Sequence, residues 1–347
     1  MRYEGFAIKK LLLIFMINVA LIGFGYWGKN LARNFFANPS CRLHTIVDAD
    51  EKKLAGLEKN FPGVRTSARI EDVLTNHEVN AIAIATQPST HYNLAQRALQ
   101  TGKHVLVEKP MTTQVHECEE LIALANNSKL VLMPDHTFLY TGAVQKIKSL
   151  LSSDEIGTVN YIDSTRINLG LFQSDVNVLW DLAAHDISIC SYLLNKSPVS
   201  VQATGISHLQ NGIENIAYLT LRYPENVIAH FNCSWSSPVK IRQMLFGGTK
   251  KMIVYNDMEP TEKVKVYDAG YTPSADKSKW LIDYRMGDIF VPKLPLNEAL
   301  AEMVKDFVGA IEHSSQPISN WKVGLEVVKV LAASQKSLQQ NGQPITL

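Results

Sequence analysis

The stretch Gly23-Phe24-Gly25-Tyr26-Trp27-Gly28 joins the apolar run Ile17–Ile22 to a helical pattern over Gly28–Asn38. In such a strand–turn–helix unit, the first glycine permits a tight turn and the second lets the backbone approach a pyrophosphate. The third lets the helix pack closely on the strand. Asp48 ends the next predicted strand, where a carboxylate accepts hydrogen bonds from ribose hydroxyls and repels a 2′-phosphate. The pattern therefore predicts a dinucleotide site that takes NAD rather than NADP.

From residue 17 to about Tyr140, short apolar runs alternate with amphipathic stretches. The predicted strands are Ile17–Ile22, Leu43–Val47, Ala81–Ala85, His104–Val107 and Leu130–Met133. The predicted helices are Gly28–Asn38, Glu51–Lys59, Ile70–Thr75, Ser89–Thr101 and Val115–Asn126. This alternation is typical of a parallel sheet with helices on both faces, and continuous apolar strands are typical of burial on both sides. We expect an α/β Rossmann domain that binds NAD over residues 16–140.

The character of the chain changes after a predicted helix over Gly142–Leu151. Longer strands rich in Thr, Tyr and Val follow, at Val159–Ile167, Val199–Gly205, Ile216–Tyr223, Val227–Trp235 and Gln243–Tyr255. Helical periodicity returns at Leu182–Leu194, Leu296–His313 and Trp321–Gln340. Residues 141–347 are therefore predicted to form an α+β domain with an open, mainly antiparallel sheet.

The N-terminus allows two interpretations. Lys9-Lys10 followed by the apolar run Leu11–Ile17 has features of a signal peptide, but no small-x-small cleavage site follows directly. Cleavage near the run would destroy the first strand and the glycine turn, and the run is too short and broken to span a bilayer. We prefer Met16 as the natural start, with residues 1–15 an upstream extension without a role in the fold.

Composition and charge narrow the class of protein. The 347 residues carry a net charge of +1, with 46% hydrophobic and 19% charged residues, as in an ordinary globular protein. This balance gives no electrostatic reason to expect nucleic acid or an acidic membrane as a partner. The four cysteines form no C-x-x-C pair, so we expect reduced thiols, no metal site and a cytoplasmic location.

Two further groups of residues suggest chemistry. Lys109 follows the predicted strand His104–Val107, at the strand end that lines the ligand crevice of a doubly wound sheet. Asp181 and His185 are i, i+4 neighbours on a predicted helix, where a carboxylate would favour the protonated imidazole and orient it for proton transfer. A surface lysine, and a capping aspartate beside a packed histidine, are the structural alternatives.

The ordered set of motifs resembles the Gfo/Idh/MocA family, named after glucose–fructose oxidoreductase, inositol dehydrogenase and a rhizopine-catabolism protein. The motifs are the glycine turn with Tyr26-Trp27, Thr86-x-Pro88-x-x-His91, Glu108-Lys109-Pro110 and Asp181-x-x-x-His185. The resemblance implies an enzyme that transfers hydride between NAD and a hydroxyl carbon of a sugar or cyclitol. Lys109 then contacts the reacting hydroxyl, His185 transfers the proton and Asp181 holds substrate. Ala183 departs from the glycine that is common in Asp-x-Gly-x-His.

The resemblance also assigns the cofactor-binding residues Gly23, Phe24, Gly25, Tyr26, Trp27, Gly28, Asp48, Thr86, Pro88, His91, Glu108 and Lys109. We expect the substrate site to comprise Lys109, His136, Tyr140, Arg166, Asn177, Asp181 and His185. Arg166 is interpreted either as a ligand of a phosphate or carboxylate or as an ion-pair residue.

The stretch from Asn168 to His185 resembles family members linked to nucleotide-sugar metabolism, so the predicted substrate is a nucleotide-linked sugar. A free sugar or inositol is the alternative. Two further alternatives are a non-catalytic NAD-binding sensor or scaffold and an enzyme that recycles tightly held NAD within each turnover. The resemblance further implies that residues 141–347 bind substrate and support oligomerisation, so we expect a homodimer or homotetramer.

Overall fold

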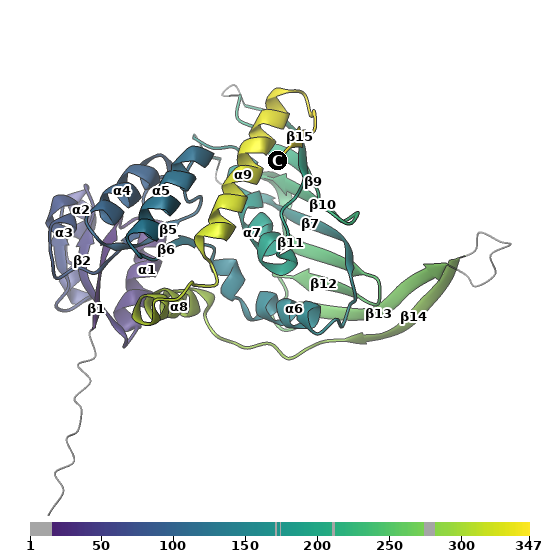
Figure 1. Cartoon of the computed structure of the whole chain (residues 1–347), viewed down its shortest axis with the longest axis horizontal. Helices are drawn as coiled ribbons and strands as arrows, with labels where there is room; N and C mark the ends of the chain where they lie inside the picture. Colours follow the sequence, from purple (N-terminus) through teal and green to yellow (C-terminus); the bar gives the residue numbers. More distant parts are fainter. Residues whose placement is uncertain (1–15, 171, 174, 210–211, 274–281) are drawn as a thin grey trace, which may run out of the picture.

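The computed structural model describes residues 16–170, 172–173, 175–209, 212–273 and 282–347 (Figure 1). The expected extension over residues 1–15, and with it the choice between an export signal and an upstream start, lies outside the described residues. Two sheets organise the described chain, one of six strands and one of nine. No helix in these ranges is long and apolar enough to cross a membrane.

The first sheet is entirely parallel, as the alternating pattern predicts. Its order is β3 (Arg65–Ser67), β2 (Cys41–Val47), β1 (Ile17–Ile22), β4 (Ala81–Ile84), β5 (His104–Glu108) and β6 (Leu132–Asp135). The apolar side chains of the central strands are almost fully buried, because helices α1 (Tyr26–Ala37), α4 (Pro88–Gln100) and α5 (Val115–Asn127) cover the sheet. The Rossmann prediction is confirmed.

Local differences from the predicted elements have local causes. The predicted helix over Glu51–Lys59 is two short pieces, α2 (Glu51–Leu54) and the 3₁₀ turn η1 (Leu57–Lys59). Gly56 separates them in a left-handed conformation with φ of 75°, which ends the first piece. The predicted helix over Ile70–Thr75 is the single turn α3 (Glu71–Leu74). The edge strand β3 is short and carries no apolar run that could have predicted it.

The second sheet is mixed but mostly antiparallel, which confirms the predicted class. Its order is β14 (Ile282–Phe290), β13 (Val264–Pro273), β12 (Met252–Asn256), β11 (Ser236–Gly248), β7 (Val159–Leu169), β10 (Ile228–Ser234), β9 (Ile216–Arg222), β8 (Ser200–Ile206) and β15 (Ile345–Thr346). Among the described strands of this second sheet, only β10 and β7 pair in parallel; the other pairings are antiparallel.

The sequence pattern missed three strands of this sheet, β13, β14 and the two-residue β15, and merged two others. The predicted strand over Gln243–Tyr255 is a hairpin of β11 and β12, which turns after Gly248. Strands β13 and β14 form a long ribbon that extends away from the rest of the molecule (Figure 1). The described side chains of β14 are exposed on both faces, so no alternation of apolar and polar residues marks it.

Four helices accompany the second sheet in sequence: α6 (Gly142–Ser152), α7 (Ala184–Leu194), α8 (Ala299–His313) and α9 (Trp321–Gln339). Helix α8 packs against α1 of the first sheet, where the rings of Phe35 and Phe307 meet edge to face at 6.3 Å. Helix α9 contacts α5 and β6 as well as α7 and β8, so it lies against both sheets (Figure 1). The C-terminal helices therefore hold the two sheets together.

Candidate active site

A cleft of about 970 Å³ opens at the carboxyl ends of the parallel strands. Segments that lie far apart in the sequence meet there, from the glycine turn after β1 to the turn at Trp180 and Asp181, which precedes α7 in the second half of the chain. Among the residues predicted to bind cofactor or substrate, those that line this cleft are Gly23, Gly25, Tyr26, Trp27, Asp48, Thr86, Pro88, Glu108, Lys109 and Asp181. The structure thus brings the predicted cofactor turn and Lys109 into one cavity.

The glycine turn is shaped by close backbone packing. Gly23 has φ of 96°, and a Cβ on it would lie 2.4 Å from the carbonyl oxygen of Ala85. A Cβ on Gly28 would lie 2.0 Å from the carbonyl oxygen of Gly23, so only glycine lets α1 pack this closely. A Cβ on Gly25 would meet no atom within 4 Å, and no side chain caps α1 there. The open approach and the uncapped N–H groups fit the pyrophosphate of a dinucleotide.

Asp48 lies at the end of β2 with its carboxylate fixed by the backbone. Its Oδ2 accepts a hydrogen bond from the Phe24 N–H at 2.7 Å, and its Oδ1 accepts one from the Asp50 N–H at 2.9 Å. Burial alone would raise the pKa of this carboxyl, but the backbone hydrogen bonds and the nearby Lys53 ammonium lower it. Asp48 is therefore an ionised acceptor at the cleft wall, as an adenosine ribose requires.

Replacing Asp48 with alanine is expected to raise the Kd of NAD about tenfold or more, because hydrogen bonds to a charged group contribute about 1.5–3 kcal/mol. The Kd of NADP should change much less, since its 2′-phosphate loses a repulsive carboxylate. Titration calorimetry with both cofactors measures the two values, and Asp50→Ala provides the control. Equal weakening of NAD and NADP would argue against a ribose contact.

Three predicted cofactor residues support the cleft instead of lining it. Phe24 is buried and contributes its N–H to Asp48, and Gly28 lies in the contact between α1 and β1. The ring of fully buried His91 lies between two carbonyl oxygens, with Nδ1 2.8 Å from that of Pro110 and Nε2 3.2 Å from that of Thr86. His91 thus joins the loops after β4 and β5, and the prediction of a direct cofactor contact is corrected to a positioning role.

Lys109 and Asp181 form an ion pair between the two halves of the chain. Nζ of Lys109 donates to Oδ1 of Asp181 at 3.2 Å and to its carbonyl oxygen at 2.9 Å. Oδ2 of Asp181 accepts a hydrogen bond from Nε1 of Trp235 at 2.9 Å. Sequence reasoning missed Trp235, because its contact depends on how β10 packs against the turn at Asp181 and leaves no local signal. The ammonium of Lys109 is held at the cleft, partly buried and oriented.

The predicted interaction between Asp181 and His185 is wrong. No hydrogen bond or ion pair joins them in the described ranges, because a π-helical turn, η3 (Leu179–Ala183), precedes α7 and breaks the regular i, i+4 relation. The imidazole of His185 instead packs on Phe138, with ring centroids 4.9 Å apart. Burial and the positive charges of Lys109 and Arg166 place the pKa of His185 well below its usual range. The sequence pattern suggested a protonated imidazole, but the structure favours a neutral one.

A buried polar layer lies beneath Lys109. Glu108 ends β5 opposite Asp135 of β6, and both carboxyls are buried. Burial, together with the neighbouring Asp135 carboxyl, raises the pKa of Glu108 well above its usual range, which favours a protonated acid. The next residue, His136, is also buried, and burial lowers its pKa to about 3. Neither ring nitrogen of His136 has a hydrogen-bond partner among the residues described.

Arg166 is an ion-pair residue, the second of the two interpretations offered by the sequence. Its Nε donates to both carboxylate oxygens of Asp186 at 3.0 Å, and both side chains are almost completely buried. Ser164 adds a hydrogen bond to the same carboxylate at 2.9 Å. The expectation that Arg166 binds a substrate anion is therefore not supported.

Two other predicted substrate residues are engaged within the protein. The hydroxyl of Tyr140 donates to Asp306 at 2.7 Å and accepts from the Ser319 N–H at 3.0 Å. The side chain of Asn177 accepts from two backbone N–H groups at the start of η3 and donates to Glu214 and Gln335. With their hydrogen-bonding capacity used, neither residue is placed as a substrate ligand. Both instead secure segments around the cleft.

Comparison with known proteins gives a consistent result over both halves of the chain. Residues 17–136 match the GFO/IDH/MocA model described as an oxidoreductase family with an NAD-binding Rossmann fold, and residues 144–254 match the C-terminal domain model of that family. The chain is 26% identical over 308 residues to UDP-N-acetylglucosamine 3-dehydrogenase of Acidithiobacillus ferrooxidans, covering 85% of this chain and 88% of the relative.

Two more similarities extend over most of the chain. Inositol 2-dehydrogenase of Rhizobium meliloti is 21% identical over 346 residues, covering 94% of this chain and 98% of the relative. The crystal structure of a protein from Magnetospirillum magnetotacticum described as an oxidoreductase is 29% identical and superposes with a TM-score of 0.78. That similarity covers 92% of this chain and 99% of the other.

Proposed function

The chain belongs to the GFO/IDH/MocA family of oxidoreductases with an NAD-binding Rossmann domain, and from this we propose that it oxidises a secondary hydroxyl of a nucleotide-linked sugar. The observation that carries the proposal is the placement of Lys109. Its ammonium lies in the same cleft as the glycine turn and Asp48, held by Asp181 from the second half of the chain. A cation so placed can stabilise an alkoxide beside a bound dinucleotide.

Different residues of the cleft bind different parts of the dinucleotide. In the proposal, the glycine turn and the N-terminus of α1 hold the pyrophosphate, Asp48 holds the adenosine ribose, and Thr86, Pro88 and Glu108 line the rest of the cofactor site. When bound, NAD supplies the two-electron acceptor. Lys109 both touches substrate and borders the cofactor.

Oxidation of an alcohol also requires a group that takes the hydroxyl proton. We assign this role to His185, whose lowered pKa leaves a neutral imidazole able to accept a proton at neutral pH. Lys109 stabilises the negative charge that develops on the oxygen, and Asp181 orients Lys109 and binds substrate. His136, another predicted substrate residue, is buried and is not among the residues that line the cleft.

The acid limb of the pH profile tests the role of His185. Since its pKa is lowered, the imidazole stays unprotonated as the pH falls through 6.5, the ordinary histidine value, and protonates only at lower pH. We therefore expect kcat/KM to stay level down to pH 6.5 and to decrease only at lower pH. This decrease at acid pH should be absent from a His185→Ala variant. A limb centred at or above 6.5 would contradict a neutral base. Circular dichroism at each pH controls for acid unfolding.

The substrate class rests on the relatives. One of them is a UDP-N-acetylglucosamine 3-dehydrogenase, which supports a nucleotide-linked sugar, and the similarity to inositol 2-dehydrogenase supports the alternative of a free sugar or cyclitol. Turnover with NAD and either UDP-N-acetylglucosamine or myo-inositol separates the two. Release of one NADH per sugar oxidised is expected. Tight NAD binding without turnover of any sugar would favour a sensor or scaffold, and sugar turnover without NADH release would favour cofactor recycling.

We also propose that residues 16–140 and 141–347 act as the NAD-binding and substrate-binding domains, and that the chain assembles as a homodimer or homotetramer in the cytoplasm. The second sheet supports the assembly, because exposed apolar side chains lie on several of its strands, including Tyr218 of β9, Ile228 of β10 and Val239 of β11. Sedimentation of the purified protein would give the oligomer size.

A further inference from the structure

Two arginines face each other across neighbouring strands near the candidate site. Arg166 of β7 and Arg242 of β11 are directly paired in the antiparallel register, so their side chains leave the same face of the sheet. Like charges directly opposite each other destabilise a sheet unless something compensates for them. Whether each arginine is free to bind a ligand therefore depends on how far nearby carboxylates neutralise its charge.

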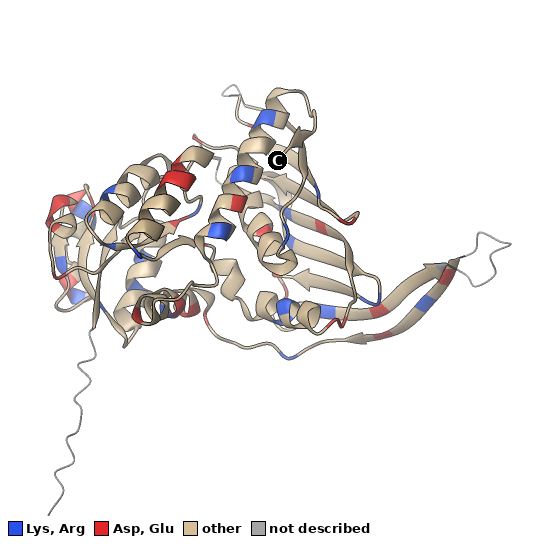
Figure 2. Ribbon diagram, in the orientation of Figure 1, with Lys and Arg blue, Asp and Glu red and all other residues tan. Residues whose placement is uncertain are grey.

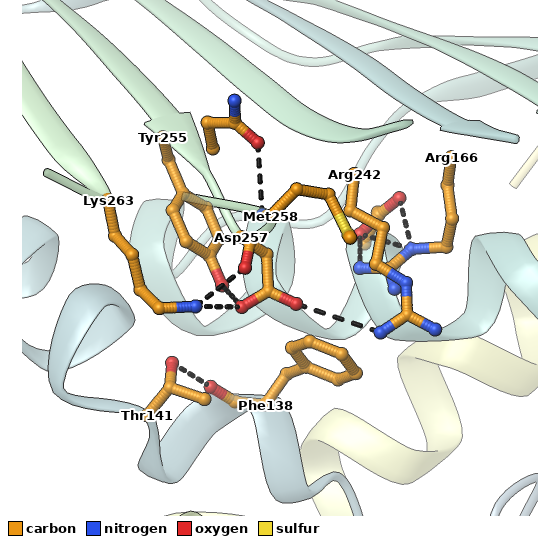
Figure 3. Close-up of polar contacts among 10 residues, drawn as sticks. Phe138, Thr141, Arg166, Arg242, Tyr255, Asp257, Met258 and Lys263 are labelled. Carbon is orange, nitrogen blue, oxygen red and sulfur yellow. Dashed lines mark hydrogen bonds and ion pairs between the residues drawn. The ribbon is translucent and has the colours of Figure 1, made fainter. Parts of the chain in front are cut away.

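The two arginines are compensated unequally. Arg166 donates from Nε to both oxygens of buried Asp186. Arg242 has only a loose ion pair, with Nη1 3.7 Å from Oδ2 of Asp257. Figure 3 shows Asp257 between Arg242 and Lys263, and Lys263 donates to its Oδ1 at 3.0 Å. Three cations thus share two carboxylates, which leaves one positive charge in excess.

The donors of Arg242 are also unused. Its guanidinium makes no hydrogen bond to any residue in the described part of the chain, although it has five N–H donors in a rigid fork. Its side chain is 32% exposed, whereas that of Arg166 is 4% exposed. Arg242 can therefore accept a ligand that Arg166 cannot.

Phe138 connects this arginine to the proposed base. The guanidinium carbons of Arg166 and Arg242 lie 4.6 Å and 6.0 Å from the centre of the Phe138 ring, and Figure 3 shows both side chains beside this ring. The His185 ring also contacts Phe138, with ring centroids 4.9 Å apart. Arg242 is thus a neighbour of the site where the reacting hydroxyl would lie.

We propose that Arg242 binds an oxyanion of the substrate, either the diphosphate of a nucleotide-linked sugar or the carboxylate of a sugar acid. This rests on the proposed function and names a specificity residue for it. The fork of Arg242 pairs with two oxygens of the anion, while Lys263 keeps Asp257 compensated. The role that the sequence suggested for Arg166 thus belongs to its cross-strand neighbour.

Binding of small probes tests the anion site without requiring turnover. Protein saturated with NAD, so that the cofactor cleft is filled, is titrated calorimetrically with inorganic diphosphate, D-glucuronate and D-glucose. We expect an oxyanion to bind wild type and to bind R242Q about 10- to 100-fold more weakly, the loss typical of a charge-assisted hydrogen bond. The control R222Q removes an exposed arginine of β9 and should bind as wild type does.

The probes also separate the two sources of the anion. Preference for diphosphate indicates a nucleotide-linked sugar, and preference for glucuronate over glucose indicates a sugar acid. An Asp257→Asn variant removes the competing carboxylate and should bind the preferred oxyanion more tightly than wild type. Equal binding by wild type and R242Q, or no binding of either oxyanion to wild type, would overturn the proposal.

Turnover distinguishes this inference from the proposed function. With an active anionic sugar, R242Q should raise KM far more than it lowers kcat, and the preference over neutral sugars should shrink by the same factor. If no sugar is oxidised, the proposed function fails, while the calorimetric result for Arg242 stands by itself.

Discussion

Replacing Lys109 with methionine is expected to lower kcat by about 10²- to 10⁴-fold, the range found for positioned proton-transfer and charge-stabilising groups. Methionine keeps most of the side-chain volume but removes the ammonium that Asp181 orients at the cleft. The Kd of NAD should change little, because the glycine turn and Asp48 make the main proposed contacts with the cofactor.

Steady-state kinetics with saturating NAD measure the loss, and cofactor titration verifies that the variant still binds. Lys59→Met, which removes an exposed lysine of η1, serves as the matched control and should retain wild-type kcat. His185→Ala should be impaired as well. Wild-type rates in both Lys109→Met and His185→Ala would eliminate the proposed mechanism.

The second large effect concerns stability. Asp186→Asn is expected to lower the free energy of unfolding by about 3–5 kcal/mol, because it leaves the guanidinium of Arg166 buried without its counter-charge. Both side chains are almost completely buried, so water cannot replace the lost carboxylate. Urea titration followed by fluorescence measures the change.

Asp163→Asn is the control. Asp163 is an exposed residue of β7, the strand that carries Arg166, and its side chain points to the opposite face of that strand. The double variant Arg166→Met with Asp186→Leu should recover most of the lost stability, since apolar residues of similar volume can replace a buried pair. If Asp186→Asn unfolds at the same urea concentration as Asp163→Asn, the ion pair of Arg166 and Asp186 does not contribute to the free energy of unfolding.

The features that could be predicted from the sequence are those with local causes. The apolar runs of β1 and β4 predict a buried parallel sheet because each run lies in one strand, and the glycine turn is explained by contacts that begin at Gly23. Strand β14 was missed because its exposed residues carry no apolar periodicity, whereas β13 was missed although Val264 and Val266 alternate as buried residues at its start.

The side-chain partners were less predictable because they depend on register and packing. Asp181 lies within a π-helical turn that ends just before the helix of His185, and nothing in the residue types reveals this turn. Trp235 reaches Asp181, and Arg242 pairs with Arg166, only after distant strands have packed. The sequence therefore identified Lys109 and Asp48 at the cleft, but it predicted the wrong side-chain partner for Asp181 and left the role of Arg166 open between an anion ligand and an ion-pair residue.

Transfer of deuterium from sugar to cofactor is the most direct test of whether this protein transfers hydride from a sugar carbon to NAD. The protein is incubated with NAD and UDP-N-acetylglucosamine deuterated at its ring carbons, and with deuterated myo-inositol in parallel, and the cofactor is analysed by mass spectrometry. We predict NADH that carries one deuterium per molecule, formed by wild type and far more slowly by Lys109→Met. NADH without deuterium, or cofactor that stays oxidised with both sugars, would contradict hydride transfer from a sugar carbon.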